Sequence, residues 1–237
     1  MTSQPAAADS TSYLHTPSTT PYTASTLSQC LDKQAAEPGD KEAYVVRATG
    51  APRQSISFGQ LKEQVDHLAS SLIRLGLKER SKVILSGVSS IEYVVSELAI
   101  IRAGLISVRT SLTINQISQQ ALSRIINYNS AVALLYYPGE YGEHQEYLEK
   151  MFPALREAHS AGKVTVETLP TLQYFINMRH ETSTKVMTVG NLLQQPVDPA
   201  LVRNRSNGVE ADDIATITYT PGSETKPKPV PDRKSVV

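Results

Sequence analysis

Short apolar runs that alternate with helix-type stripes constrain the fold of this chain more than any other feature. Segments 82–86, 105–109 and 131–137 consist mostly of apolar residues, which is typical of strands buried on both faces. Segments 89–104 and 113–129 separate them and repeat apolar residues at helical spacing. Strands joined through helices by short connections form parallel sheets with helices on both faces. The sequence therefore predicts an α/β fold with a mainly parallel sheet.

Two helices upstream of these segments carry their own start signals. Thr26 is followed by Gln29, and Ser57 by Gln60, at the spacing of a capping box in which each side chain bonds the other's backbone N–H. Gly76 stands where a left-handed C-cap would end the second helix. The second helix also has a regular apolar stripe, made of Leu61, Val65, Leu68, Leu72 and Leu75.

Four further elements complete the expected order. Strands are predicted at 42–48, at 171–178 and, from the β-branched run before the last glycine, at 214–220. Segment 142–159 is predicted to be a long helix that Pro153 breaks or kinks, because proline removes a backbone donor and clashes with the preceding turn.

Composition and charge argue against several classes of function. The 237 residues include 23 basic and 23 acidic side chains, and a net charge of zero argues against a nucleic-acid partner. No apolar run approaches the roughly 20 residues of a transmembrane segment. Cys30 is the one cysteine, so neither a disulfide nor a cysteine metal site can form within the chain, and we expect it to be a small core residue. Asp212 and Asp213 are interpreted as a solvated turn, and nothing predicts an oligomeric state.

The ends of the chain differ in composition from its middle. Residues 1–25 are rich in Ser, Thr, Pro and Ala and are expected to be a flexible arm. This arm lacks the apolar core of a secretory signal, and the first arginine is Arg47, so the expected location is cytoplasmic. The α/β region is expected to span 26–220, and a Pro- and Lys-rich tail to follow at 221–237.

The stretch "IATITYTPGSETKPKPV" at 214–230 raises the possibility of phosphate binding. A strand is followed there by hydroxyl residues, a glycine and lysines. Backbone N–H groups and hydroxyls can surround phosphate oxygens while lysine neutralises their charge. The prolines at alternate positions leave open a second interpretation of this stretch, namely an extended linker or polyproline ligand.

Three stretches in order resemble a known family. They are "SISFGQLKEQVDHLASSLIRLGLKERSKV", "SSIEYVVSELAIIRAGLISVRTSLT" and "ADDIATITYTPGSETKPKPV". Together they resemble the N-terminal part of the adenylate-forming (AMP-binding) synthetases, and most closely the medium-chain acyl-CoA synthetases. The resemblance runs from about Leu27 to Val230 and is specific as an ordered series.

The resemblance implies a reaction and a set of ligands. It implies ATP-dependent activation of a medium-chain fatty acid as an acyl-adenylate, followed by transfer of the acyl group to the CoA thiol. ATP, Mg²⁺ and CoA are the implied cofactor, metal and co-substrate, and the family includes mitochondrial members. The positions that match the family's phosphate loop are Thr220, Gly222, Ser223 and Lys228.

The chain also departs from the family pattern. In the phosphate loop, Pro221 and Glu224 replace hydroxyl residues, and Thr225 and Pro229 replace glycines. Glycines there let the backbone approach phosphate closely, and a carboxylate repels it. A second departure is Arg109, which with Thr110 stands where the family commonly has Asn-Pro.

In the family, the adenine-binding segment, the ribose-binding aspartate, the magnesium-coordinating glutamate and the catalytic lysine come after the phosphate loop. We therefore expect an N-terminal fragment that is inactive as this chain alone. The alternative is a non-catalytic binding or regulatory fragment, for which the final "SVV" matches the ends bound by PDZ-type domains. A third possibility is an unstable fragment whose last strand leaves the sheet edge exposed.

Overall fold

A computed structural model describes residues 24–47, 50, 52–110, 113–157, 163–181, 183, 185–219 and 228–233. Its centre is a seven-stranded sheet in the order β7-β6-β5-β3-β4-β8-β9. Every neighbouring pair is parallel except β8 and β9, which confirms the predicted mainly parallel α/β fold. The strands are β3 (Lys82–Ser86), β4 (Ile106–Arg109), β5 (Ala133–Tyr136), β6 (Tyr174–Asn177), β7 (Met187–Thr188), β8 (Ile214–Tyr219) and β9 (Pro229–Arg233).

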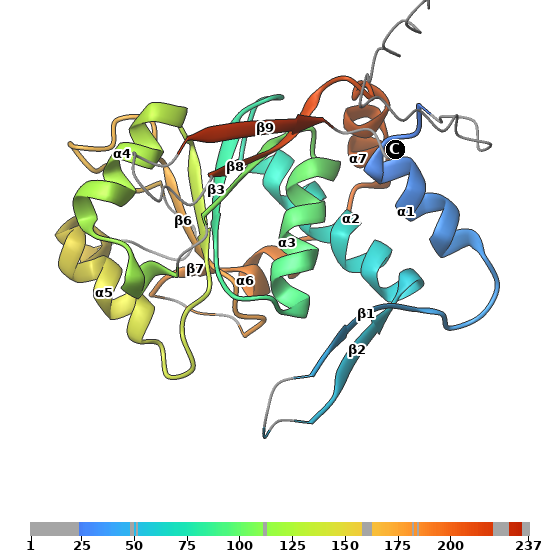
Figure 1. The fold of residues 1–237 in the computed structure, drawn as a ribbon, viewed down its shortest axis with the longest axis horizontal. Coiled ribbons are helices and arrows are strands. Elements are labelled where there is room, and N and C mark those ends of the chain that lie inside the picture. Colours follow the sequence, from blue (N-terminus) through green and yellow to red (C-terminus); the bar gives the residue numbers. More distant parts are fainter. Residues whose placement is uncertain are drawn as a thin grey trace, which may run out of the picture.

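Helices cover both faces of this sheet, as predicted (Figure 1). One face packs against α3, with α2 and α1 stacked outside it and α6 and α7 alongside. The other face packs against α4 and α5. The helices are α1 (Leu27–Ala36), α2 (Phe58–Arg74), α3 (Ile91–Arg102), α4 (Gln119–Asn129), α5 (Glu143–Met151), α6 (Val189–Leu193) and α7 (Pro199–Asn207).

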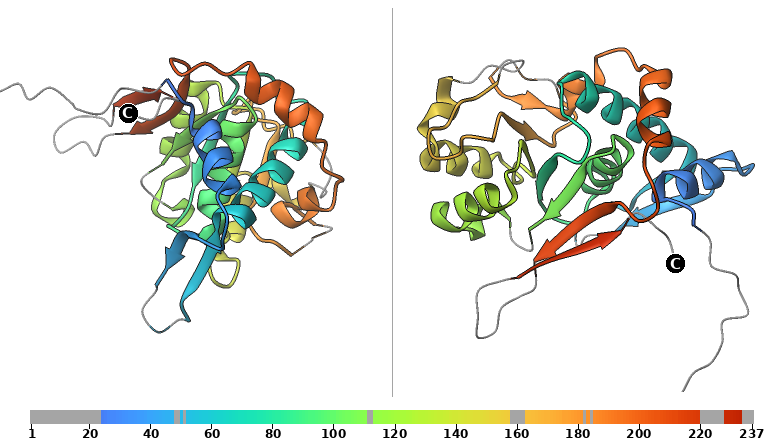
Figure 2. Two further views of the ribbon diagram at one scale, coloured as in Figure 1. Left: turned by 90° about the vertical axis from the view of Figure 1, so that its right-hand side faces the viewer. Right: turned by 90° about the horizontal axis from the view of Figure 1, so that it is seen from above.

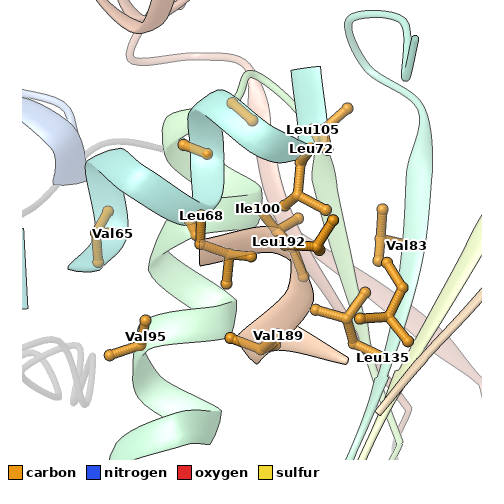
Figure 3. Packing of buried hydrophobic residues seen from close by; sticks show 14 of the residues in the cluster. Val65, Leu68, Leu72, Val83, Val95, Ile100, Leu105, Leu135, Val189 and Leu192 are labelled. Carbon is orange, nitrogen blue, oxygen red and sulfur yellow. The ribbon is translucent and has the colours of Figure 1, made fainter. Parts of the chain in front are cut away.

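The larger core cluster joins α2, α3 and the sheet into one apolar interior. Figure 3 shows Val65, Leu68 and Leu72 of α2 pointing toward the α3 side chains Val95 and Ile100. Because α2 lies outside α3, α3 is buried on two sides, and its buried apolar residues are Val95, Ala99, Ile100 and Ile101. The second cluster, on the α4 and α5 face, is centred on Ile84, Leu122, Ile126, Leu134 and Leu148.

The predicted helix signals are confirmed in detail. Both capping boxes form: Thr26 accepts from the Gln29 N–H, and Ser57 accepts from the Gln60 N–H. Gly76 has φ +83°, the left-handed conformation that glycine adopts without a Cβ penalty. Cys30 on α1 is half-buried, so it lies at the margin of the core.

Two predicted helices are interrupted. Segment 113–129 splits into a 3₁₀ turn at Ile114–Gln116 and helix α4, because Ser118 accepts from the Ala121 N–H and starts a new helix. Helix α5 ends before Pro153, as predicted, and the chain continues as a 3₁₀ helix at Pro153–Glu157. The remainder of that prediction, 158–159, lies outside the described residues.

Several elements escaped the sequence analysis. The predicted strand near 42 is β1 (Glu42–Val46), but it pairs antiparallel with β2 (Gln54–Ser57), a strand that was not expected. This hairpin lies apart from the main sheet (Figure 1). Between β6 and β8 the chain forms β7, α6 and α7, and the side chain of Asp198 caps α7 by accepting from the Leu201 N–H.

The prediction of a linker-like tail is wrong for residues 229–233, which form β9. This strand pairs antiparallel with β8 and occupies the edge of the sheet (Figure 2). Backbone N–H groups of alternate residues in a strand point to the same side, so Pro229 and Pro231 fit an edge, where their missing donors can face away from β8. The strand β8 is therefore paired on both sides rather than exposed. The "SVV" motif and the arm up to Thr23 lie outside the described residues.

Candidate functional site

The carboxyl ends of the parallel strands form one edge of the sheet, where ligands of open α/β folds bind. Strand β3 lies between β4 and β5. Connections from β3 and from β5 leave in opposite directions, so the topological switch point lies between these two strands. Gly87 follows β3 there, and a Cβ on it would lie 3.1 Å from the Cβ of Tyr137 and 3.2 Å from Cδ2 of Tyr93. The backbone at Gly87 therefore passes too close to Tyr93 and Tyr137 for a larger side chain to fit without a shift.

A polar cluster lies along the same edge, between β4 and β8. The Nε of Arg109, the last residue of β4, donates to the hydroxyl of Thr218 at 3.2 Å. The same Nε lies 3.4 Å from a carboxylate oxygen of Glu97 on α3. Thr218 is exposed, and Arg109 is 38% exposed, so the cluster is open to solvent.

Burial shifts the pKa values of Glu97 and Tyr93, the two titratable side chains of α3 next to Arg109. Desolvation raises the pKa of Glu97, and the positive charge of Arg109 opposes that shift. Desolvation, with the nearby charge of Glu97, raises the pKa of Tyr93 to about 12. The Tyr93 phenol is therefore neutral at physiological pH.

Most of the predicted phosphate-loop residues lie outside the described residues, namely Thr220, Gly222 and Ser223. Lys228 is described and is exposed, directly before β9. The Cα partner of Pro229 is Tyr219, so the two described ends of the segment lie side by side at the carboxyl edge. The phosphate-loop assignment of the residues between these ends stays a prediction.

Tyr219 fixes the end of β8 from the other face of the sheet. Its hydroxyl accepts a hydrogen bond from the Asn129 side chain of α4 at 2.8 Å. Burial raises the pKa of this phenol, which keeps it neutral. Neither this anchor nor the contact of Arg109 with Glu97 was visible in the sequence, because each joins residues far apart in the chain. The one available signal was Arg109 itself, a charged residue at a strand end.

No metal site forms among the residues that the structure describes: no three His, Cys, Asp or Glu side chains gather in a way that could hold an ion. The turn at Asp212 and Asp213 makes ion pairs, with Arg233 at 2.8 Å and with Arg80 at 2.9 Å. His144 is buried with its Nδ1 2.8 Å from the Tyr137 carbonyl. The described residues thus offer no ready set of ligands for Mg²⁺.

A groove of about 830 Å³ lies elsewhere, between α1, α2 and α7. Its floor includes Arg102, which makes two hydrogen bonds with Asp32 at 2.7 and 2.9 Å and one with Asp66 at 2.9 Å. A further bond at 3.2 Å goes to the carbonyl of Ser28. These contacts tie α1, α2 and α3 together, which is a structural role.

The family model for the AMP-binding enzyme matches residues 31–232, which covers most of the chain. The chain belongs to the AMP-binding enzyme family. This finding agrees with the resemblance to adenylate-forming acyl-CoA synthetases seen in the sequence.

Curated relatives share this region at moderate identity. The chain is 27% identical over 211 residues to the bovine (Bos taurus) medium-chain acyl-CoA ligase ACSF2, mitochondrial, which covers 86% of this chain and 32% of the relative. It is 26% identical over 208 residues to acyl-CoA ligase SID4 of Ajellomyces capsulatus, with 86% and 32% covered. The chain therefore spans about a third of the length of the curated relatives it matches.

Solved structures show the same fold. A benzoate CoA ligase from Burkholderia xenovorans LB400 superposes with a TM-score of 0.62 at 18% identity over 88% of this chain and 34% of that one. The Mycobacterium tuberculosis fatty acyl CoA synthetase gives 0.61 at 17% identity, over 88% and 34%. At these identities the likeness establishes the fold alone. None of the described helices combines the length and the apolar character needed to cross a membrane.

Proposed function

We propose that this chain is the N-terminal part of an ATP-dependent medium-chain fatty acid–CoA ligase. The observation that carries the proposal is the position of β8 and β9, whose paired ends at Tyr219 and Pro229 lie at the carboxyl edge of the sheet, in a chain that the AMP-binding family model matches. The names of the curated relatives support the medium-chain acid as substrate. The expected unit 26–220, together with β9 at Pro229–Arg233, would supply the fold, and the rest of 221–237 the altered loop and the tail.

The proposed reaction has two steps. An oxygen of the fatty acid carboxylate attacks the α-phosphate of ATP, and pyrophosphate leaves. The thiol of CoA then attacks the acyl carbon, and AMP leaves. In this scheme Thr220, Gly222 and Ser223 offer hydroxyls and a backbone N–H to phosphate oxygens, and Lys228 offers a cation. Mg²⁺ belongs to the proposal through the phosphates of ATP, since the described residues form no site for it.

We further propose that the chain by itself does not catalyse this reaction and that its loop binds phosphate weakly. Pro221 removes a backbone donor, and Glu224 brings a negative charge toward the phosphates. Two or three lost charge-assisted hydrogen bonds, at roughly 1.5–3 kcal/mol each, weaken binding by several orders of magnitude.

Two measurements test these statements. ATP–pyrophosphate exchange with medium-chain fatty acids is expected to stay at the level of a heat-killed control, and exchange above it contradicts the proposed inactivity. Calorimetric titration with ATP compares the natural chain with a variant that carries Pro221→Ser, Glu224→Thr and Thr225→Gly. Pro229 stays in the variant because it begins β9. The variant is expected to bind ATP at least tenfold more tightly than the natural chain. Equal affinities of the two proteins for ATP would contradict the phosphate-loop assignment.

The location of the protein follows the same relatives. The name of the bovine relative places that protein in mitochondria, so we propose a mitochondrial location, with the cytoplasm as the alternative. Cell fractionation with the tagged chain distinguishes the two compartments. A non-catalytic binding or regulatory role remains the competing function, and it gains support if the loop variant binds no nucleotide.

A further inference from the structure

Arg109 lies beside the strand that leads into the predicted phosphate loop. The parallel register pairs Arg109 with Thr218 of β8, and the antiparallel register pairs Thr218 with Val230 of β9. These three residues stand in one row across the sheet, so their side chains share the α3 face. Tyr219, the last residue of β8, follows Thr218 directly. Arg109 therefore lies at the carboxyl edge of the sheet, beside the last residues of β8.

The contacts of Arg109 occupy only one of its nitrogens. Its Nε donates to Thr218 at 3.2 Å and lies 3.4 Å from Glu97. Within the described ranges, neither terminal nitrogen of Arg109 has a hydrogen-bond acceptor. The two terminal nitrogens of a guanidinium form the planar fork that binds two oxygens of a phosphate or carboxylate.

Arg102, which has a structural role, differs from Arg109 in the hydrogen bonds of its guanidinium nitrogens. The side chain of Arg102 is 8% exposed, and Nε and both terminal nitrogens donate to protein oxygens. The side chain of Arg109 is 38% exposed and keeps its fork available among the described residues. Glu97, only 18% exposed, lies 3.4 Å from the Nε end of this side chain. Within the described part of the chain, the protein therefore orients the Arg109 side chain through Nε, and its two terminal nitrogens stay available to a ligand.

We propose that Arg109, positioned by Thr218 and Glu97, binds phosphate oxygens of ATP or pyrophosphate at the carboxyl edge between β4 and β8. The proposal rests on the proposed function, because it assigns a phosphate ligand to the same edge. It also gives the family departure at this position a role, because a charged fork stands where the family commonly has Asn-Pro.

The experiment measures binding of inorganic pyrophosphate, ATP and adenosine to the whole chain by calorimetry. The test variant is Arg109→Gln with Glu97→Gln, which leaves the net charge unchanged and leaves no buried carboxylate unpaired. The matched control is Arg80→Gln with Asp213→Asn, which removes an ion pair of 2.9 Å from the opposite edge of the sheet. Thermal unfolding establishes that each variant is folded.

The test variant is expected to bind pyrophosphate and ATP at least tenfold more weakly than the natural chain, while the control stays within twofold. Adenosine, which has no phosphate, is expected to bind equally to all three proteins. Thr218→Val removes the hydroxyl that holds Nε at an exposed strand position, and a loss of about threefold is expected. This variant decides the matter if the double variant does not fold.

Three outcomes overturn the proposal. The first is a natural chain that shows no pyrophosphate binding up to 10 mM. The second is a folded test variant with natural affinity, and the third is an equal loss in the control. These outcomes are separate from failure of the proposed function, which is decided by whether the variant with the restored loop gains affinity for ATP.

Discussion

The central strands and the β8–β9 edge of this protein differ in how far their side chains are exposed to solvent. All residues of β5 are buried, and the apolar residues of β3 are completely inaccessible. At the edge, Thr218 is exposed, Val230 is 48% exposed, and β9 contains two prolines. The centre is close-packed and tolerates little change, whereas the edge can exchange residues with little cost to the fold. A chain of this family can therefore keep the central fold while residues at the β8–β9 edge change.

The sharpest test of this difference truncates one aliphatic side chain in each region. Ile84→Ala in β3 is expected to lower the free energy of unfolding by about 2–5 kcal/mol, because it leaves a cavity in a fully packed core. Ile84 has no accessible surface. Val230→Ala in β9 is expected to cost about 0.5 kcal/mol or less, since much of that side chain already contacts water. Urea unfolding followed by circular dichroism measures both.

Equal losses in Ile84→Ala and Val230→Ala would erase the distinction between centre and edge. A loss above about 2 kcal/mol in Val230→Ala alone would show instead that β9 is packed as tightly as the core.

The same distinction explains how far the sequence could predict the structure. The helices α1 and α2 and the strand β3 were predicted because their capping boxes and apolar stripes are local signals. Strand β9 was missed because prolines argue against a strand unless the sheet edge is known to be there. β7 has two residues and carries almost no pattern.

The candidate site was predicted only in part, for the same physical reason. Strand β8, which precedes the predicted phosphate loop, followed from a linear pattern, and the loop itself stays a prediction. The contacts of Arg109 with Glu97 and Thr218 depend on how α3, β4 and β8 pack, and no linear pattern specifies them. The residues that orient a site lie far from it in sequence, so their identification required the structure.

A buried ion pair of Arg102 on α3 and an exposed ion pair of Arg233 on β9 provide a second comparison. Arg102→Met is expected to lower the free energy of unfolding by about 2–4 kcal/mol, because it leaves Asp32 and Asp66 without their buried partner. Arg233→Met removes the pair with Asp212, whose side chains are 68% and 81% exposed, and is expected to change it by less than about 1 kcal/mol. Chemical denaturation of both variants at one ionic strength is the measurement. Similar losses would contradict the structural role of Arg102.

Helix capping provides a smaller test within the packed region. Ser57→Ala removes the side chain that accepts from the Gln60 N–H at the start of α2. A loss of about 1 kcal/mol is expected, since the N–H is left without its cap. Ser57→Asp keeps an acceptor at the same place and is expected to retain most of the stability. A loss in Ser57→Asp as large as that in Ser57→Ala would show that the hydroxyl contributes by packing rather than by capping.

The smallest effect concerns the pH dependence of Glu97, which faces Arg109 and Tyr93 on the α3 face. Burial raises the pKa of this carboxyl above the ordinary value of 4.5. The folded chain therefore keeps a proton that the unfolded chain has already lost, and stability falls as pH rises from about 4.5 through the raised pKa. Glu97→Gln removes this titration. The stability of the variant relative to the natural chain is thus expected to increase across that pH range and then to level off, as measured by urea unfolding at pH 4, 5, 6 and 7. A difference that is constant with pH, or that decreases, would show that the ion pair with Arg109 outweighs burial at this carboxyl.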